Sequence, residues 1–212
     1  MSERVQTSGE ELANAISHGL GFVAAIVGTP ILIVTAVKTG GTAGVIGASV
    51  FAATMALLYL TSSVYHALPK GQAKRVFKLL DHSAIYLLIA GSYTPFTLGV
   101  LRGPLGWTLL GIVWGLAIGG ILIKALGALK CEKISTFIYL AMGWLVLIAI
   151  KPLWENMPTV GLAWLVAGGV AYSVGVIFFM TDRRYAYGHF VWHLFVLAGT
   201  GCHFVAVWRY AG

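Results

Sequence analysis

Two histidines four residues apart, His189 and His193, lie in the last apolar stretch of the chain. In a helix, residues at this spacing lie on one face, a single turn apart. An imidazole inside a membrane is costly unless it finds a polar partner, so this pair indicates a functional site. A third histidine, His203, lies about 15 Å deeper at 1.5 Å per residue, which is too far to bind the same ion. The partners of His189 and His193 must therefore come from other helices.

Further polar side chains lie where two earlier apolar stretches adjoin one short connection. Ser62 and His66 are one turn apart near the end of the second stretch, and Asp81, near the start of the third, is the only acid within a predicted span. Three neutral imidazoles with one open position are the recurring ligand set of catalytic zinc, which lowers the pKa of its bound water to about 7. We expect His66 to join His189 and His193 as the ligands of a Zn²⁺ ion. Asp81 and Ser62 are then the catalytic groups, which orient ligands, accept a proton or donate a hydrogen bond to an oxyanion.

The elements that must position these residues are those of an integral membrane protein. Of 212 residues, 58% are hydrophobic and only 10% are charged, whereas soluble domains have about a quarter charged residues. A hydrocarbon core about 30 Å thick needs roughly 20 apolar residues per helix. Such runs occur at residues 18–37, 43–68, 79–100, 105–124, 134–151, 159–180 and 189–209. Because the connections are short, the sequence predicts an all-α seven-transmembrane helix bundle over residues 18–212, after a short cytoplasmic arm, residues 1–17.

Basic residues are unevenly distributed about these spans. Ten of the 14 Lys and Arg residues fall on the N-terminal arm and on the second, fourth and sixth connections. Cytoplasmic connections carry the excess of basic residues, so the N-terminus is predicted in the cytoplasm and the C-terminus outside. His66, Asp81 and His189 then share one depth near the cytoplasmic face. The net charge of +7 reports this topology and not nucleic-acid binding, since no soluble basic domain is present. The two cysteines, Cys131 and Cys202, lie at different depths, so no disulfide is expected.

Four stretches of the chain resemble the hemolysin III family, the bacterial branch of the progestin and adipoQ receptor superfamily, which is distantly related to alkaline ceramidases. They are Glu11 to Gly19 (ELANAISHG), Ser62 to His66 (SSVYH), Asp81 to Phe96 (DHSAIYLLIAGSYTPF) and the stretch from Gly188 to His203. The resemblance implies a zinc site near the cytoplasmic face, carried here by Ser62, His66, Asp81, His189 and His193. It also implies a multi-pass protein of the bacterial inner (plasma) membrane. The short N-terminal arm argues against a protein hormone as ligand.

Three functions fit this pattern. The first is a zinc-dependent hydrolase, ceramidase-like, that acts on an amide or ester of a membrane lipid. The second is a sensor or regulator of membrane state in which zinc is structural. The third is a pore or ion-coupled transporter, with a cytolysin-type activity, in which Asp81 and the histidines relay protons. Membrane lipids are the expected partners and nucleic acid is not.

For the other polar residues near these spans we expect structural roles. Asn14 and His18 lie one turn apart at the start of the first span; the alternatives are that they reach the same cavity as the site, or, as we expect, that they satisfy groups at the helix end. His82 follows Asp81 and therefore points about 100° away from it round the helix. His203 is expected to hydrogen-bond across helices or to line the bottom of a cavity.

Overall fold

The computed structural model describes residues 4–128 and 132–211, and all regular secondary structure within them is helical. Cys131 therefore lies outside the described residues. The elements are α1 (Ser8–Thr39), α2 (Gly41–Ala67), α3 (Gln72–Leu98), α4 (Pro104–Ala125), α5 (Glu132–Trp144), the 3-10 helix η1 (Leu145–Ala149), α6 (Ile150–Asn156), α7 (Thr159–Thr181) and α8 (Gly188–Tyr210).

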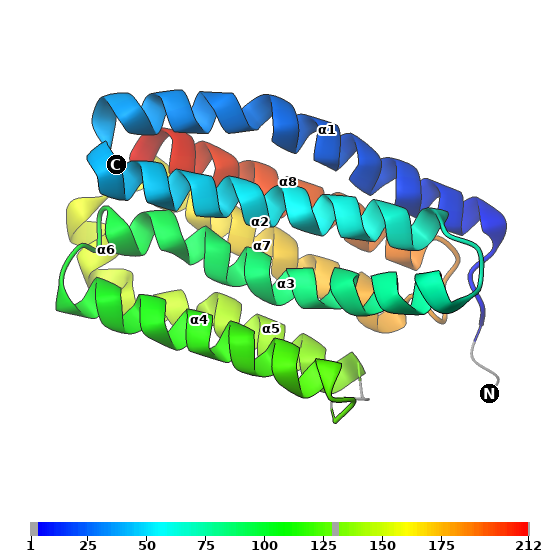
Figure 1. Cartoon of the computed structure of the whole chain (residues 1–212). Coiled ribbons are helices and arrows are strands. Elements are labelled where there is room, and N and C mark those ends of the chain that lie inside the picture. Colours follow the sequence, from blue (N-terminus) through cyan, green and yellow to red (C-terminus); the bar gives the residue numbers. More distant parts are fainter. Residues whose placement is uncertain (1–3, 129–131, 212) are drawn as a thin grey trace.

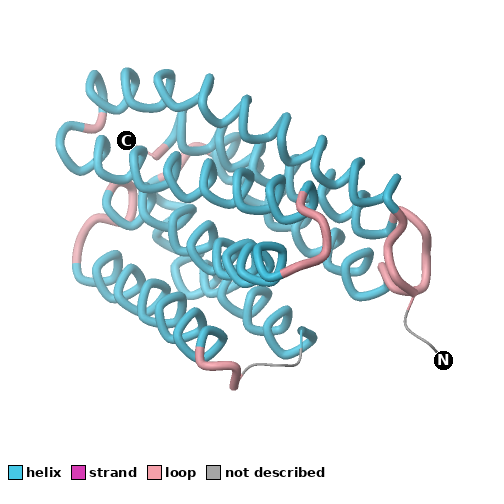
Figure 2. Tube along the Cα trace, turned by 45° about the vertical axis from the view of Figure 1, so that its right-hand side comes forward, coloured by secondary structure: helices cyan, strands magenta, loops and turns pink. Residues whose placement is uncertain are grey.

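The long helices run side by side as one bundle (Figure 1). Consecutive helices α1, α2, α3 and α4 pack against one another in order, and α7 packs against α8. The first and last helices, far apart in sequence, also pack together. Figure 2 shows the loops gathered at the two ends of the bundle. The start of α8 and the end of α2 can therefore meet beside the start of α1.

Six helical segments are long and apolar enough to cross a membrane: α1, α2, α4, the combined segment Glu132–Asn156, α7 and α8. The predicted all-α membrane architecture is confirmed. Helix α3 is also long, at 27 residues, but its first turns carry charged side chains, among them Lys74, Lys78 and Asp81. By length and apolarity alone, the described residues thus supply six spans.

Helix α1 begins at Ser8, earlier than the predicted start of the first span at residue 18. Thr7 is its N-cap: the Thr7 hydroxyl accepts the Glu10 N–H at 3.3 Å, and the Glu10 carboxylate accepts the Thr7 N–H at 2.9 Å. This reciprocal capping box satisfies donors that a helix start otherwise leaves unpaired. Residues expected in a cytoplasmic arm, including Glu11 and Asn14, are therefore helical.

The predicted fifth span, residues 134–151, is broken where α5 gives way to η1. In a regular α-helix the Val146 N–H would donate to the Met142 carbonyl oxygen. Instead, the Tyr93 hydroxyl of α3 accepts from the Val146 N–H at 2.8 Å, and it donates to the carbonyl oxygens of Met142 and Gly143, which lie 2.9 and 2.7 Å away. A side chain inserted into the helix ladder in this way bends the helix. The break thus has a cause in another helix, which the local sequence does not reveal.

Candidate metal centre

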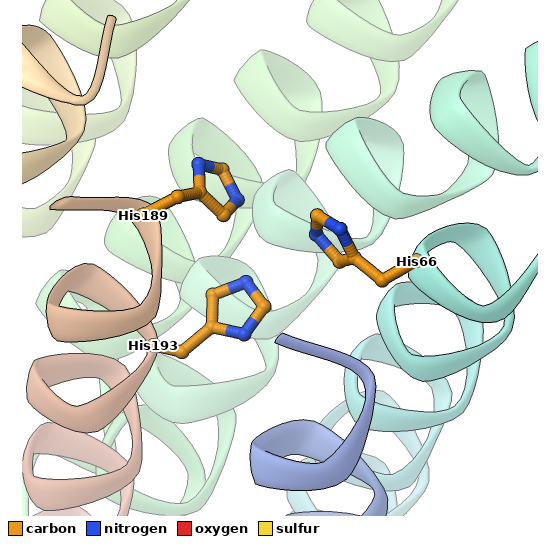
Figure 3. A group of neighbouring side chains, drawn as sticks. All are labelled: His66, His189 and His193. Carbon is orange, nitrogen blue, oxygen red and sulfur yellow. The ribbon is translucent and has the colours of Figure 1, made fainter. Parts of the chain in front are cut away.

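The three predicted ligands meet at one end of the bundle. His66 comes from the last turn of α2, and His189 and His193 come from the first turns of α8. One ring nitrogen of each lies within 4.8 Å of the others. The ring centroids form a nearly equilateral triangle, with sides of 5.1, 5.1 and 4.9 Å (Figure 3). We call these three residues the histidine triad.

Carboxylates hold two rings of the triad. The Nδ1 atom of His66 lies 2.7 Å from Oε2 of Glu11, on α1. The Nδ1 atom of His189 lies 2.9 Å from Oδ2 of Asp182, just after α7. An ionised carboxylate only accepts hydrogen bonds, so Nδ1 carries the proton in both rings. This assignment leaves the Nε2 lone pair of each ring for a metal ion.

A backbone carbonyl holds the third ring. The Nδ1 atom of His193 lies 3.2 Å from the carbonyl oxygen of Asn14 and 3.0 Å from the Ser17 hydroxyl. Ser17 donates to the same Asn14 oxygen at 2.9 Å. Because a carbonyl cannot donate, the nearby Nδ1 of His193 is assigned as protonated, which again leaves Nε2 for a ligand. All three rings of the triad therefore present the same nitrogen.

The residues present fit a metal ion. The Nε2 atom of His66 is buried and has no hydrogen-bond partner among the described residues. A buried polar atom left unpaired costs about 1–3 kcal/mol, and coordination would remove that cost. Neutral imidazoles suit zinc, copper, iron and nickel. Three protein ligands with a free position are the arrangement of catalytic zinc sites.

A cavity of about 210 Å³ adjoins the triad and is lined by both predicted catalytic residues, Ser62 and Asp81. From there the cavity runs along apolar side chains of α3, α5, η1, α7 and α8 and reaches His203. The site thus combines a polar end and a long apolar wall.

The histidine ring partners were not found from the sequence. Glu11 was assigned to the short N-terminal arm, Asn14 to the helix end one turn before His18, and Asp182 to a connection. The spacing of Glu11, Asn14 and His18 places all three on one helical face, which is a signal that a helix start at Ser8 would have revealed. No local signal exists for Asp182, because its approach to the ring depends on how the α7–α8 connection folds.

The remaining histidines lie near the cavity in different ways. His18 stacks in parallel on His193, with ring centroids 3.5 Å apart, and it lines the cavity, which is the alternative to the helix-end role that we expected for it. His203 lies at the far end, with Nε2 3.4 Å from the Leu165 carbonyl oxygen of α7, as expected of a cross-helix hydrogen bond. His82 lines the cavity but is not part of the triad.

The helical membrane bundle agrees with the comparison to known families. The profile described as "Haemolysin-III related" matches residues 6–204. The chain belongs to the hemolysin III family. It is 49% identical over 210 residues to "Hemolysin-3" of Bacillus cereus, covering 99% of this chain and 95% of that protein. It is 44% identical over 201 residues to "Hemolysin-3 homolog" of Bacillus subtilis (strain 168), covering 95% and 94%.

A mammalian relative is more distant. "Monocyte to macrophage differentiation factor" of Homo sapiens is 31% identical over 206 residues, covering 95% of this chain and 84% of that protein. Together with the six apolar helices, these relationships make this family member a multi-pass bacterial membrane protein.

Proposed function

We propose that this hemolysin III family member binds a zinc ion on the histidine triad and hydrolyses an amide or ester bond of a membrane lipid. The observation that carries the proposal is the shared arrangement of the three rings. Each Nδ1 lies against an acceptor of the protein, the Nε2 atom of His66 is buried without a partner among the described residues, and His189 and His193 line the adjoining cavity. Zinc in such a site lowers the pKa of a coordinated water and polarises a carbonyl.

The protein's own groups supply orientation and proton transfer. Glu11, Asp182 and the Asn14 carbonyl hold the rings, which fixes their tautomer and raises their basicity as ligands. The Asp81 carboxylate, 7% exposed, lines the cavity and is our general base. Ser62, 1% exposed, lines the same cavity as Asp81 and donates a hydrogen bond to the substrate oxygen as negative charge develops on it.

The apolar part of the cavity supports a lipid as substrate. A lipid head group carries the amide or ester that would lie near Asp81, and its tail would lie along the apolar wall between α3, α5, α7 and α8. A zinc-dependent hydrolase that acts on a soluble substrate would not need this apolar wall. The apolar wall therefore supports a lipid as the substrate, and the polar end at Asp81 supports cleavage of a polar bond near the head group.

We also propose that α3 crosses the membrane, which gives seven spans with the N-terminus in the cytoplasm. Helix α3 packs between α2 and α4, and short connections join it to both. The two termini lie at opposite ends of the bundle, as an odd number of crossings requires (Figure 1). The excess of basic residues near the triad end supports a cytoplasmic location for the site.

Elemental analysis of the purified protein and lipid turnover in nanodiscs test the proposal together. The wild type should carry one zinc per chain, and His66→Ala should lose it. His203→Ala is the control, because His203 lies outside the triad and should leave zinc content unchanged. Asp81→Asn should keep zinc and lose hydrolysis. A wild-type protein without zinc, or His66→Ala with full zinc content, would rule the site out.

A structural metal is the second candidate, favoured by the way the triad joins elements. His66 on α2 and His193 on α8 are both held by groups of α1. In that case His66→Ala would lower the melting temperature, and no lipid would be turned over by the zinc-loaded wild type. A pore or transporter would instead show ion or proton flux in proteoliposomes that Asp81→Asn abolishes.

A further inference from the structure

The N-terminal segment is tied to the α7–α8 connection through Glu10. This carboxylate is 3% exposed, and its Oε1 atom accepts the Tyr187 N–H at 2.8 Å. Arg4 pairs with both Glu10 oxygens, with Nη1 2.8 Å from Oε2, and it donates to the Tyr185 carbonyl oxygen at 3.3 Å. The hydrogen bond to Glu10 raises the pKa of the Arg4 guanidinium, so Arg4 stays charged in this contact.

The partner of Glu10 has an unusual backbone conformation. Tyr187 has φ of 58°, and within residues 4–128 and 132–211 it is the one non-glycine residue with a positive φ. A side chain on an L-residue disfavours this left-handed conformation, which persists only where its surroundings hold it. Tyr187 is also the N-cap of α8 and makes no side-chain capping bond. The Glu10 carboxylate is thus the acceptor that holds this turn from outside the connection.

The turn at Tyr187 lies between Asp182 and His189, the proposed metal ligand whose ring Asp182 contacts. Gly188 follows, and a Cβ there would lie 2.9 Å from the Cα of Asp182, so the two ends of the connection are in close contact. This closure places Asp182 Oδ2 2.9 Å from Nδ1 of His189. If Tyr187 relaxed to a negative φ, the connection would change course between Asp182 and His189. Their hydrogen bond would then not be held in place.

We propose that Glu10 is a positioning residue for the metal ligand His189, acting through the backbone of Tyr187. The inference rests on the proposed metal site and deepens it. Glu10 does not touch the triad; it holds the left-handed turn that sets Asp182 against the His189 ring. Loss of a partner in the outer shell of a metal site weakens metal binding by about 10- to 100-fold, and we expect Glu10→Ala to fall in that range.

Zinc affinity, measured by competition with a chelator in nanodiscs, tests the inference with matched variants. Glu10→Ala removes the acceptor for Tyr187 and should weaken zinc binding at least about tenfold. Glu10→Gln keeps an amide oxygen that can accept the same N–H, and it should bind zinc nearly as the wild type does. Thr7→Ala is the control for the helix cap, because it weakens the start of α1 but leaves the Glu10–Tyr187 bond.

A rescue variant separates positioning from general stabilisation. Glycine adopts a positive φ without steric cost, so Tyr187→Gly should restore most of the zinc affinity lost in Glu10→Ala. The inference is overturned if the double variant binds no better than Glu10→Ala. It is also overturned if Thr7→Ala weakens zinc binding as much as Glu10→Ala does.

Hydrogen exchange of the metal-free protein distinguishes failure of this inference from failure of the metal site. The amides of residues 187–189 should exchange faster in Glu10→Ala than in the wild type and in Thr7→Ala. If the wild type binds no zinc, the proposed function fails, and this measurement still decides whether Glu10 holds the turn. Equal exchange in all three proteins would refute the positioning role.

Discussion

Substitution of Glu11 measures most directly how the hydrogen-bond partners of the triad rings affect zinc affinity. Its Oε2 atom accepts the His66 Nδ1–H at 2.7 Å, and its Oε1 atom lies 3.0 Å from the Lys74 ammonium. Glu11→Ala removes the acceptor and leaves a buried N–H without this partner. Glu11→Gln keeps an oxygen acceptor but removes the charge. The two variants therefore separate the hydrogen bond from its electrostatic part.

The expected magnitude follows from this geometry. A hydrogen bond to a charged group contributes about 1.5–3 kcal/mol, and a neutral one about 0.5–1.5 kcal/mol. The Glu11 side chain is 26% exposed, so water screens the charge and the lower part of the range applies. We expect Glu11→Ala to lose about 2 kcal/mol of zinc-binding free energy, roughly a 30-fold weaker affinity. Glu11→Gln should lose about 1 kcal/mol, roughly fivefold.

Chelator competition with purified protein in nanodiscs measures these affinities. Lys74→Gln is the matched control, because Lys74 contacts the same carboxylate without touching the ring; it should change zinc affinity by less than about threefold, as for a partly exposed ion pair. The reasoning is refuted if Glu11→Ala binds zinc as tightly as the wild type. An effect of Lys74→Gln as large as that of Glu11→Ala would also refute it.

Three further predictions follow from the cavity and the fold. Asp81→Asn should keep its zinc and lose lipid hydrolysis by at least about 100-fold, as expected for loss of a general base; unchanged product formation by mass spectrometry would contradict this. Zinc at 100 times its dissociation constant should stabilise the folded protein by about 2.7 kcal/mol, seen as a rise in melting temperature that His193→Ala abolishes; an equal rise in that variant would exclude the triad. Tyr93→Phe should lower the unfolding free energy by about 1–2 kcal/mol, because the Val146 N–H and the Met142 carbonyl oxygen lose their partner. An unchanged unfolding free energy with unchanged zinc content would mean that these two groups hydrogen-bond to each other in the variant, as in a regular α-helix.

The sequence by itself indicated the all-α membrane architecture and the three histidines of the candidate site. Apolar runs report burial in lipid along each helix, and this information is local, so the helices were predictable from composition and length. The spacing of His189 and His193 is local as well, because one helical turn places both on one face. His66 was assigned through the depth that the distribution of basic residues implies, and the triad observed in the structure agrees with that assignment.

Only the tertiary structure decided which groups hold the ligands. Glu11 reaches His66 from another helix, and Asp182 reaches His189 across a turn in which the Tyr187 N–H donates to Glu10. The break after α5 likewise depends on the hydroxyl of Tyr93 from α3. Each of these hydrogen bonds joins residues brought together by packing, and a polar side chain at a span end has many partners within reach before the helices pack. Local sequence reports helix formation and burial, whereas the choice of polar partner is made by the packed bundle.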